Sequence, residues 1–214
     1  MKRFLNLASV FLLLVGLSGI ANAYTVNYDY TVANGNEFTS PYSGVIVENF
    51  EYATEIWNWS GDGAILEGST GINAAPFGVS SADATWYVTV PYDLYDSVEN
   101  FATAELGGYY NYFGIWWGSV DSYNTLSFYN DATLVASFTG SQIVSNANGD
   151  QESHLTNLYV NFLNLPTFNK FVMASTSYAF EADNIAVGVV PEPATMLLLG
   201  LGLMGLAGVR RFKK

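Results

Sequence analysis

The sequence predicts an all-β fold, with a single jelly-roll-like β-sandwich over residues 24–189. Apolar and polar residues alternate with a period of two in several short runs, such as "TWYVTV" from Thr85 to Val90. Turn-forming pairs such as Asn34-Gly35 separate these runs. No stretch of residues 24–189 keeps a helical period over three turns with capping residues at its ends. Two packed sheets of short strands fit these observations.

The first 23 residues have the three parts of a secretory signal peptide. Lys2 and Arg3 precede an apolar run from Leu7 to Ile20, and the A-x-A site that ends at Ala23 follows. We expect signal peptidase to cut after Ala23, so that the mature chain begins at Tyr24. The alternative, a retained membrane anchor, is disfavoured because the apolar run is short for a membrane span.

Strands are expected at intervals through the middle of the chain. The runs "NTLSFYN" and "TLVASFTG" alternate in polarity on either side of Asn130-Asp131, so together they predict a hairpin. "YVNFLNL" and "KFVMAST" predict two further strands.

The last expected strand, "AFEADNIAV", changes phase in its middle. Phe180 and Ala182 keep one phase, whereas Ile185 and Val187 keep the other. Because a slip of one residue would turn half of the strand inside out, the sequence predicts a β-bulge at Asp183-Asn184.

The C-terminal segment, residues 190–214, reads "VPEPATMLLLGLGLMGLAGVRRFKK". Residues 194–209 carry no charge and predict a single transmembrane helix of about 24 Å, somewhat short for a hydrocarbon core about 30 Å thick. The basic residues of 210–214 can extend to the interface, and the positive-inside rule places them in the cytoplasm. The middle of the chain is then expected outside the membrane.

The proline-glutamate-proline triplet, the apolar helix and the Arg pair, in this order, resemble a PEP-CTERM sorting segment. The resemblance implies recognition by an exosortase, a membrane protease-transpeptidase, with Pro191, Glu192, Pro193, Arg210 and Arg211 as the sorting and cleavage residues. It also implies transfer to the cell surface or the extracellular matrix, after transient anchoring in the inner membrane. Similar tails occur on some ice-binding proteins, but the tail itself indicates nothing about ice.

A second resemblance covers part of the middle of the chain. The stretches "YFGIWWGSVDSYNTLSFYN" and "AFEADNIAV" are similar to a cyanobacterial-type group of exosortase-dependent surface proteins. The resemblance implies a surface location and a single β domain, and it implies no particular activity.

Charge is distributed very unevenly along the chain. The whole chain has a formal net charge of −12, yet Lys170 is the only Lys or Arg among residues 24–189, against eighteen Asp and Glu, so this part is close to −17. Such a surface repels nucleic acid and anionic lipid, and it suits cations and neutral glycans better. The alternative interpretation is that the charge serves solubility alone.

The sequence indicates no catalytic residue. It holds no cysteine, no G-x-S-x-G pattern and a single histidine, His154, in a polar stretch. These absences disfavour nucleophilic catalysis and a zinc site built on His and Cys. Glycoside hydrolysis needs only two carboxylates, but nothing in the sequence singles out a pair.

No cofactor is certain, and a structural calcium ion is the candidate. The stretch "NANGDQE" places Asn146, Asn148, Asp150 and Glu152 at alternate positions, although it departs from the EF-hand pattern. Phe50-Glu51 and Asp183-Asn184 resemble the "FE" and "DN" pairs between which jelly-roll glycan-binding modules often hold calcium. The resemblance implies Glu51, Asp183 and Asn184 as metal residues; the alternative is that they are ordinary turn and solvent-face residues.

The run "YYNYFGIWWG" is the strongest concentration of aromatic residues. If it is a strand, Phe113, Ile115 and Trp117 share its more apolar face, which we assign to the core. Tyr110, Tyr112 and Trp116 are then expected on the outer face as a carbohydrate-binding platform. The alternative is that these rings also fill the core.

These patterns favour a secreted surface protein without catalytic activity, with a structural or adhesive role in an extracellular polysaccharide matrix. A specific carbohydrate-binding module is the alternative, and a glycoside hydrolase is the third hypothesis.

Overall fold

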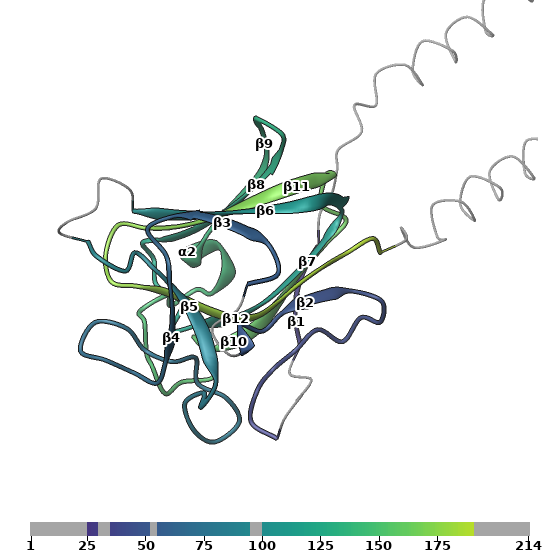
Figure 1. The fold of residues 1–214 in the computed structure, drawn as a ribbon. Helices are drawn as coiled ribbons and strands as arrows, with labels where there is room; N and C mark the ends of the chain where they lie inside the picture. Colours follow the sequence, from purple (N-terminus) through teal and green to yellow (C-terminus); the bar gives the residue numbers. More distant parts are fainter. Residues whose placement is uncertain (1–24, 30–34, 52–54, 95–99, 191–214) are drawn as a thin grey trace, which may run out of the picture.

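A computed structural model describes residues 25–29, 35–51, 55–94 and 100–190 of the chain. Two antiparallel sheets pack face to face and form the upper and lower layers in Figure 1, which confirms the predicted all-β sandwich. The predicted signal peptide, with its cleavage site at Ala23, and the transmembrane helix over 194–209 lie outside the described residues. Within the described ranges, no helix has the length and apolar character needed to cross a membrane.

The larger sheet has seven strands. Six of them lie in the order β1 (Thr25–Asp29), β10 (Leu158–Leu163), β7 (Tyr112–Gly118), β12 (Phe180–Gly188), β5 (Trp86–Val90) and β4 (Ala64–Glu67). The seventh, β2 (Ile46–Glu48), pairs with the second half of β12. Strand β12 is therefore bonded along both of its edges.

The smaller sheet has five strands. Their order is β3 (Asn58–Gly61), β6 (Phe101–Tyr110), β11 (Phe168–Ser175), β8 (Asn124–Asn130) and β9 (Thr133–Thr139), and a short helix, α2 (Gly140–Ile143), follows β9. Strands β8 and β9 form the predicted hairpin, and Asp131 in its turn has a φ of 52°, in the left-handed region that turn residues tolerate. The predicted strands "YVNFLNL" and "KFVMAST" correspond to β10 and β11.

Aromatic rings fill most of the space between the sheets. Phe113 from the larger sheet meets Phe128 and Phe171 from the smaller sheet edge to face, with both pairs of ring centroids 4.9 Å apart. Trp57 and Trp59 both meet the ring of Phe171 edge to face. With no cysteine in the chain, this packing is the main source of stability within the sandwich.

The predicted bulge in β12 is confirmed. Its register against β7 shifts between Asp183 and Ala186, and Asn184 has a φ of 47°. The extra residue keeps Ala182 and Ile185 both in the core, so the phase change in the sequence leaves one face of the strand apolar throughout. Asp183 consequently points to the opposite face of the larger sheet.

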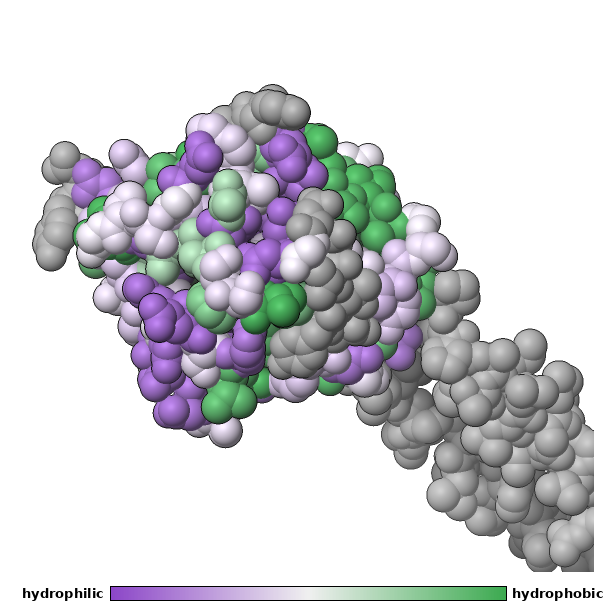
Figure 2. Space-filling model, turned by 90° about the horizontal axis from the view of Figure 1, so that it is seen from below, coloured by the Kyte–Doolittle hydropathy of each residue, from purple (hydrophilic) through white to green (hydrophobic). Residues whose placement is uncertain are grey.

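A third layer that the sequence did not predict covers that opposite face. Loops 35–44 and 68–85 lie below the larger sheet in Figure 1 and bury the outward side chains of β7, β10 and β12. Figure 2 views the molecule from this side and shows hydrophobic patches separated by hydrophilic ones. The central strands β7, β10 and β12 of the larger sheet are therefore buried on both faces.

Candidate functional site

The aromatic run does not form a single strand. Strand β6 ends at Tyr110 in the smaller sheet, and β7 begins at Tyr112 in the larger one. Asn111 turns the corner between them, because its N–H donates to the Gly188 carbonyl at 3.1 Å and its own carbonyl accepts from the Leu165 N–H at 3.0 Å. Within β7 the predicted alternation of faces is correct.

The prediction that Tyr110, Tyr112 and Trp116 form an exposed platform is wrong. Trp116 is fully buried, with the ring of Phe38 from the covering loop edge-on at 5.7 Å. Tyr112 is also fully buried; its hydroxyl donates to Asn161 Oδ1 at 2.7 Å and is bonded to the Ser40 hydroxyl at 2.7 Å. Tyr110 is partly buried and packs against the core. For Tyr112 and Trp116 the physical reason is the covering layer, which removes the outer face of β7 from solvent, whereas Tyr110 belongs to the other sheet.

Acidic side chains lie on the buried outer face of β12. Glu181 is almost fully buried, and its carboxylate accepts from the Ala74 N–H and the Ser119 hydroxyl, both at 2.9 Å. Burial raises the pKa of Glu181 from 4.5 to about 7, although these two hydrogen bonds oppose the shift. Glu181 therefore attaches loop 68–85 to the sheet through a group that titrates near neutrality.

Asp183 lies two residues further along the same face. It is fully buried, and within the described part of the chain neither of its carboxylate oxygens has a hydrogen-bond partner. Burial, followed by the charge of Asp83, raises the pKa of Asp183 well above its ordinary value. The Asn184 N–H is near enough to oppose this shift in part, although its geometry is not that of a hydrogen bond.

Asp83 was not predicted as a site residue, and nothing in "SSADATW" distinguishes it from an ordinary turn acid. It is 4% exposed, and its Oδ1 accepts from the N–H and the hydroxyl of Thr85, at 2.9 and 2.7 Å. Its Oδ2 is buried and meets no donor from the described residues. Burial raises the pKa of this carboxyl as well.

The other two predicted metal residues, Glu51 and Asn184, lie near Asp183, but their side chains differ in what they do. Glu51 is half-buried, and its charge helps to raise the pKa of Asp183. The Asn184 side chain instead ties the covering loop to the bulge, because its Nδ2 donates to the Phe38 carbonyl at 2.9 Å. Among the residues that the structure describes, no three Asp, Glu or His side chains come together closely enough to hold a metal ion by themselves.

The second calcium candidate, the stretch 146–152, has the local bonding of a turn. Asp150 is exposed, and its Oδ1 accepts from the Glu152 N–H at 3.1 Å. Its main-chain carbonyl accepts from the hydroxyl of Thr156 and from the side-chain amide of Asn157. These contacts support the alternative that Asp150 is a turn residue.

An open cleft lies at one end of the sandwich, with a volume of about 420 Å³. Tyr92 and Ile72 in its wall are each about half exposed, and Asp93 and Tyr178 also line it. The Tyr178 hydroxyl accepts from the Leu94 N–H at 2.8 Å, which fixes this side chain against the loop after β5. The cleft combines two aromatic rings with a carboxylate, and nothing in the sequence indicates that these distant residues meet.

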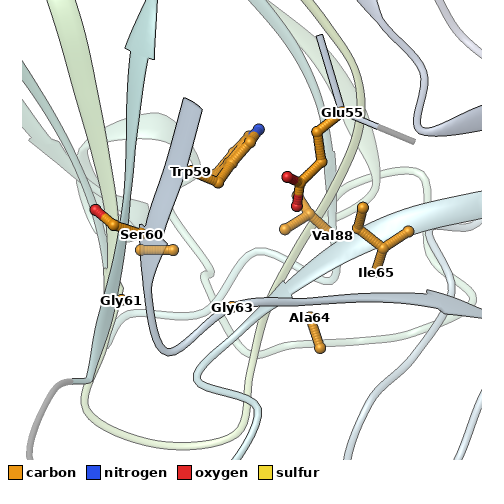
Figure 3. A pocket seen from close by; sticks show the side chains of 9 residues that line it. Glu55, Trp59, Ser60, Gly61, Gly63, Ala64, Ile65 and Val88 are labelled. Carbon is orange, nitrogen blue, oxygen red and sulfur yellow. The ribbon is translucent and has the colours of Figure 1, made fainter. Parts of the chain in front are cut away.

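A smaller pocket of about 120 Å³ lies between the edge strands β3 and β4. Figure 3 shows the Glu55 carboxylate reaching into the space between the indole of Trp59 and the side chain of Ile65. The buried indole N–H of Trp59 has no partner within the described ranges. This pocket is narrower than the cleft beside Tyr92 and has one aromatic wall instead of two.

Comparison with known proteins identifies the end of the chain. Residues 189–211 match the PEP-CTERM protein-sorting motif. The chain carries a PEP-CTERM sorting motif. The motif implies an exosortase-sorted surface protein that is processed by an exosortase. The match does not extend into the sandwich, so it identifies no group for the ectodomain, and a search of curated proteins found no match.

The PEP-CTERM motif follows the last strand without a linker. Strand β12 ends at Gly188, and the motif begins at the next residue. Asn111 holds this junction, because its side chain accepts from the Val190 N–H at 2.8 Å and donates to the Val190 carbonyl at 3.0 Å. The predicted sorting residues Pro191, Glu192, Pro193, Arg210 and Arg211 fall within the matched range but outside the described residues.

Proposed function

We propose that the ectodomain is a structural or adhesive component of an extracellular polysaccharide matrix and has no catalytic activity. The supporting observation is a PEP-CTERM motif joined directly to a sandwich in which the central strands of the larger sheet are packed on both faces. We further propose that its strands follow a jelly-roll-like arrangement and that the helix over 194–209 anchors the chain in the inner membrane until it is cleaved. The net charge close to −17 disfavours nucleic acid as a partner.

The surroundings of the titratable groups support the proposal that the protein is not an enzyme. The carboxyl groups of Asp83, Glu181 and Asp183 have raised pKa values, as catalytic acids often do, but all three are buried where the covering layer meets the larger sheet. His154 lies beside the ring of Phe77, with the two centroids 5.5 Å apart. A glycoside hydrolase therefore remains the weakest of the three hypotheses.

Sorting is tested by the ends of the mature protein. Expressed in a host that has an exosortase, the surface-exposed protein is expected to begin at Tyr24 and to end near Pro191. Intact-mass and peptide mass spectrometry of the surface fraction measure both ends. Recovery of the basic tail, Arg210 and Arg211 included, on the surface-exposed form would contradict the sorting proposal.

A second function, binding of a neutral glycan, is favoured by the cleft beside Tyr92. Aromatic rings stack on the apolar faces of sugars, and Asp93 can accept hydrogen bonds from sugar hydroxyls. The volume of the cleft lies in the range typical of small-ligand sites. An acidic glycan is disfavoured by the net charge of the domain.

The glycan proposal predicts a difference between two equally exposed tyrosines. Tyr92→Ala is expected to weaken retention in affinity electrophoresis on neutral polysaccharides roughly tenfold, because a stacking ring is lost. Tyr109→Ala, on β6 outside the cleft, is the matched control, since Tyr109 is 54% exposed and Tyr92 is 50% exposed. Equal retention of both variants would argue against a glycan site in this cleft.

A further inference from the structure

Two aspartates where loop 68–85 covers β12 have buried carboxylate oxygens that accept no hydrogen bond from the described residues. Asp183 is fully buried with neither oxygen bonded to any described residue, and Asp83, at 4% exposure, has one such oxygen. Moving an ionised carboxylate from water into the protein interior costs several kcal/mol if it finds no partner there. Buried charges are therefore normally paired or bound to a metal. Two such carboxylates close together require either a positive charge nearby or protonation, which removes their negative charge.

Asp83 lies close enough to Asp183, at the bulge in β12, for its charge to act on that residue. On one edge of β12 the partner strand changes at this point, from β5, which pairs up to Ala182, to β2, which pairs from Ile185. Asp83 lies three residues before β5, and Val88 of that strand pairs with Ala182, the residue that precedes Asp183. The charge of Asp83 accordingly acts on Asp183, as do the charges of Glu37 and Glu51.

Residues 24–190 supply no basic side chain to neutralise this group. Lys170 is the only Lys or Arg among residues 24–190, and its Nζ lies 3.4 Å from a carboxylate oxygen of Glu105 in the smaller sheet. The single histidine, His154, packs against Phe77. The compensating charge must therefore come from a proton or from a cation in the surroundings.

We propose that Asp83 and Asp183 bind one calcium ion between covering loop 68–85 and the outer face of β12. Carboxylates without nitrogen or sulfur ligands favour a hard cation. Calcium accepts six to eight oxygen ligands in flexible geometry, whereas magnesium requires a stricter octahedron and keeps several waters. Since no three acidic side chains in the described chain enclose a metal by themselves, neutral oxygens must complete the shell.

The alternative to calcium binding is that Asp183 stays protonated. The variant Asp183→Asn distinguishes these two explanations. Asparagine has nearly the same shape as a protonated aspartate but cannot replace an ionised ligand. If a proton is the compensating charge, Asp183→Asn behaves like the wild type in calcium and in EDTA. If calcium is the ligand, the variant loses the response to calcium.

Thermal unfolding of the mature protein in EDTA and in calcium chloride is the first test. A hundredfold excess of calcium over its dissociation constant is expected to raise the Tm of the wild type by roughly 5–10 °C. Asp83→Asn and Asp183→Asn are expected to lose most of this rise, while Asp150→Asn, in the exposed turn, keeps it. An unchanged wild-type Tm, or a full rise in Asp183→Asn, overturns the proposal.

Terbium luminescence tests the same site without relying on stability. Tb³⁺ replaces calcium at oxygen sites and emits when a nearby tryptophan is excited, and Trp116 is the cross-strand partner of Asp183. The expected result is sensitised emission that calcium displaces and that Asp83→Asn weakens at least tenfold, as the loss of an ionised ligand implies. Absence of sensitised emission would contradict a calcium site in the domain. Emission that is lost in Asp150→Asn but kept in Asp83→Asn would place the ion at the exposed turn and contradict the proposed site.

Discussion

Replacement of Trp117 by alanine is expected to lower the free energy of unfolding by about 3–5 kcal/mol, as for a large aromatic truncated in a packed core. Trp117 is fully buried, and its ring stacks on that of Phe180, with centroids 4.2 Å apart and planes only 9° from parallel. The stack joins neighbouring strands β7 and β12, so its loss leaves a cavity in the core between the two sheets.

Trp116→Ala is expected to cost a similar amount, about 3–5 kcal/mol, although its side chain points to the opposite face. The covering loop encloses Trp116 as completely as the core encloses Trp117. Urea unfolding followed by far-UV circular dichroism measures both variants, and Tyr109→Ala, at an exposed position, is expected to stay within about 0.5 kcal/mol of the wild type. A nearly neutral Trp116→Ala would mean that the covering layer does not pack on the sheet.

Stability in EDTA is expected to fall as the pH rises from about 4.5 to about 7. Glu181 has a folded pKa raised to about 7 from 4.5, so in this window the folded state holds a proton that the unfolded state releases. The stabilisation is complete below pH 4.5 and is lost by the time the pH passes 7, a change of about 3 kcal/mol from this group. Asp83 and Asp183, whose pKa values are also raised, act in the same direction.

Glu181→Gln isolates the contribution of this residue. Glutamine cannot ionise but can still accept from the Ala74 N–H, so the variant is expected to show a shallower fall in urea-derived stability between pH 4.5 and 7. The difference between the slopes of stability against pH for the wild type and for Glu181→Gln gives the contribution of Glu181 to the pH dependence. Identical slopes would show that Glu181 titrates alike in the folded and unfolded states.

The bulge could be predicted because its cause is local. Alternation along "AFEADNIAV" records which side chains face the core, and a strand with two phases can keep one apolar face only if a residue is inserted. The assignment of Phe113, Ile115 and Trp117 to the core was correct for the same reason.

The position of Trp116 could not be predicted because its cause is not local. Alternation separates the two faces of a strand, but it does not indicate whether a distant loop covers the second face. Phe38 precedes Trp116 by 78 residues, and nothing near either residue indicates their contact. Asp83 was missed for the same reason, since it becomes a buried residue only when the start of β5 meets the bulge.

The two hydrogen bonds between Asn111 and Val190 fix the point at which a mechanical load on the C-terminal end reaches the sandwich. A pull on the C-terminal end, once that end is attached to a surface or a polymer, enters the domain at Val190 and passes straight into β12. This strand is bonded to β7 on one edge and to β5 and β2 on the other. A force along its axis loads both rows of hydrogen bonds in shear instead of opening them one at a time, so β12 resists being pulled out of the sheet from this end.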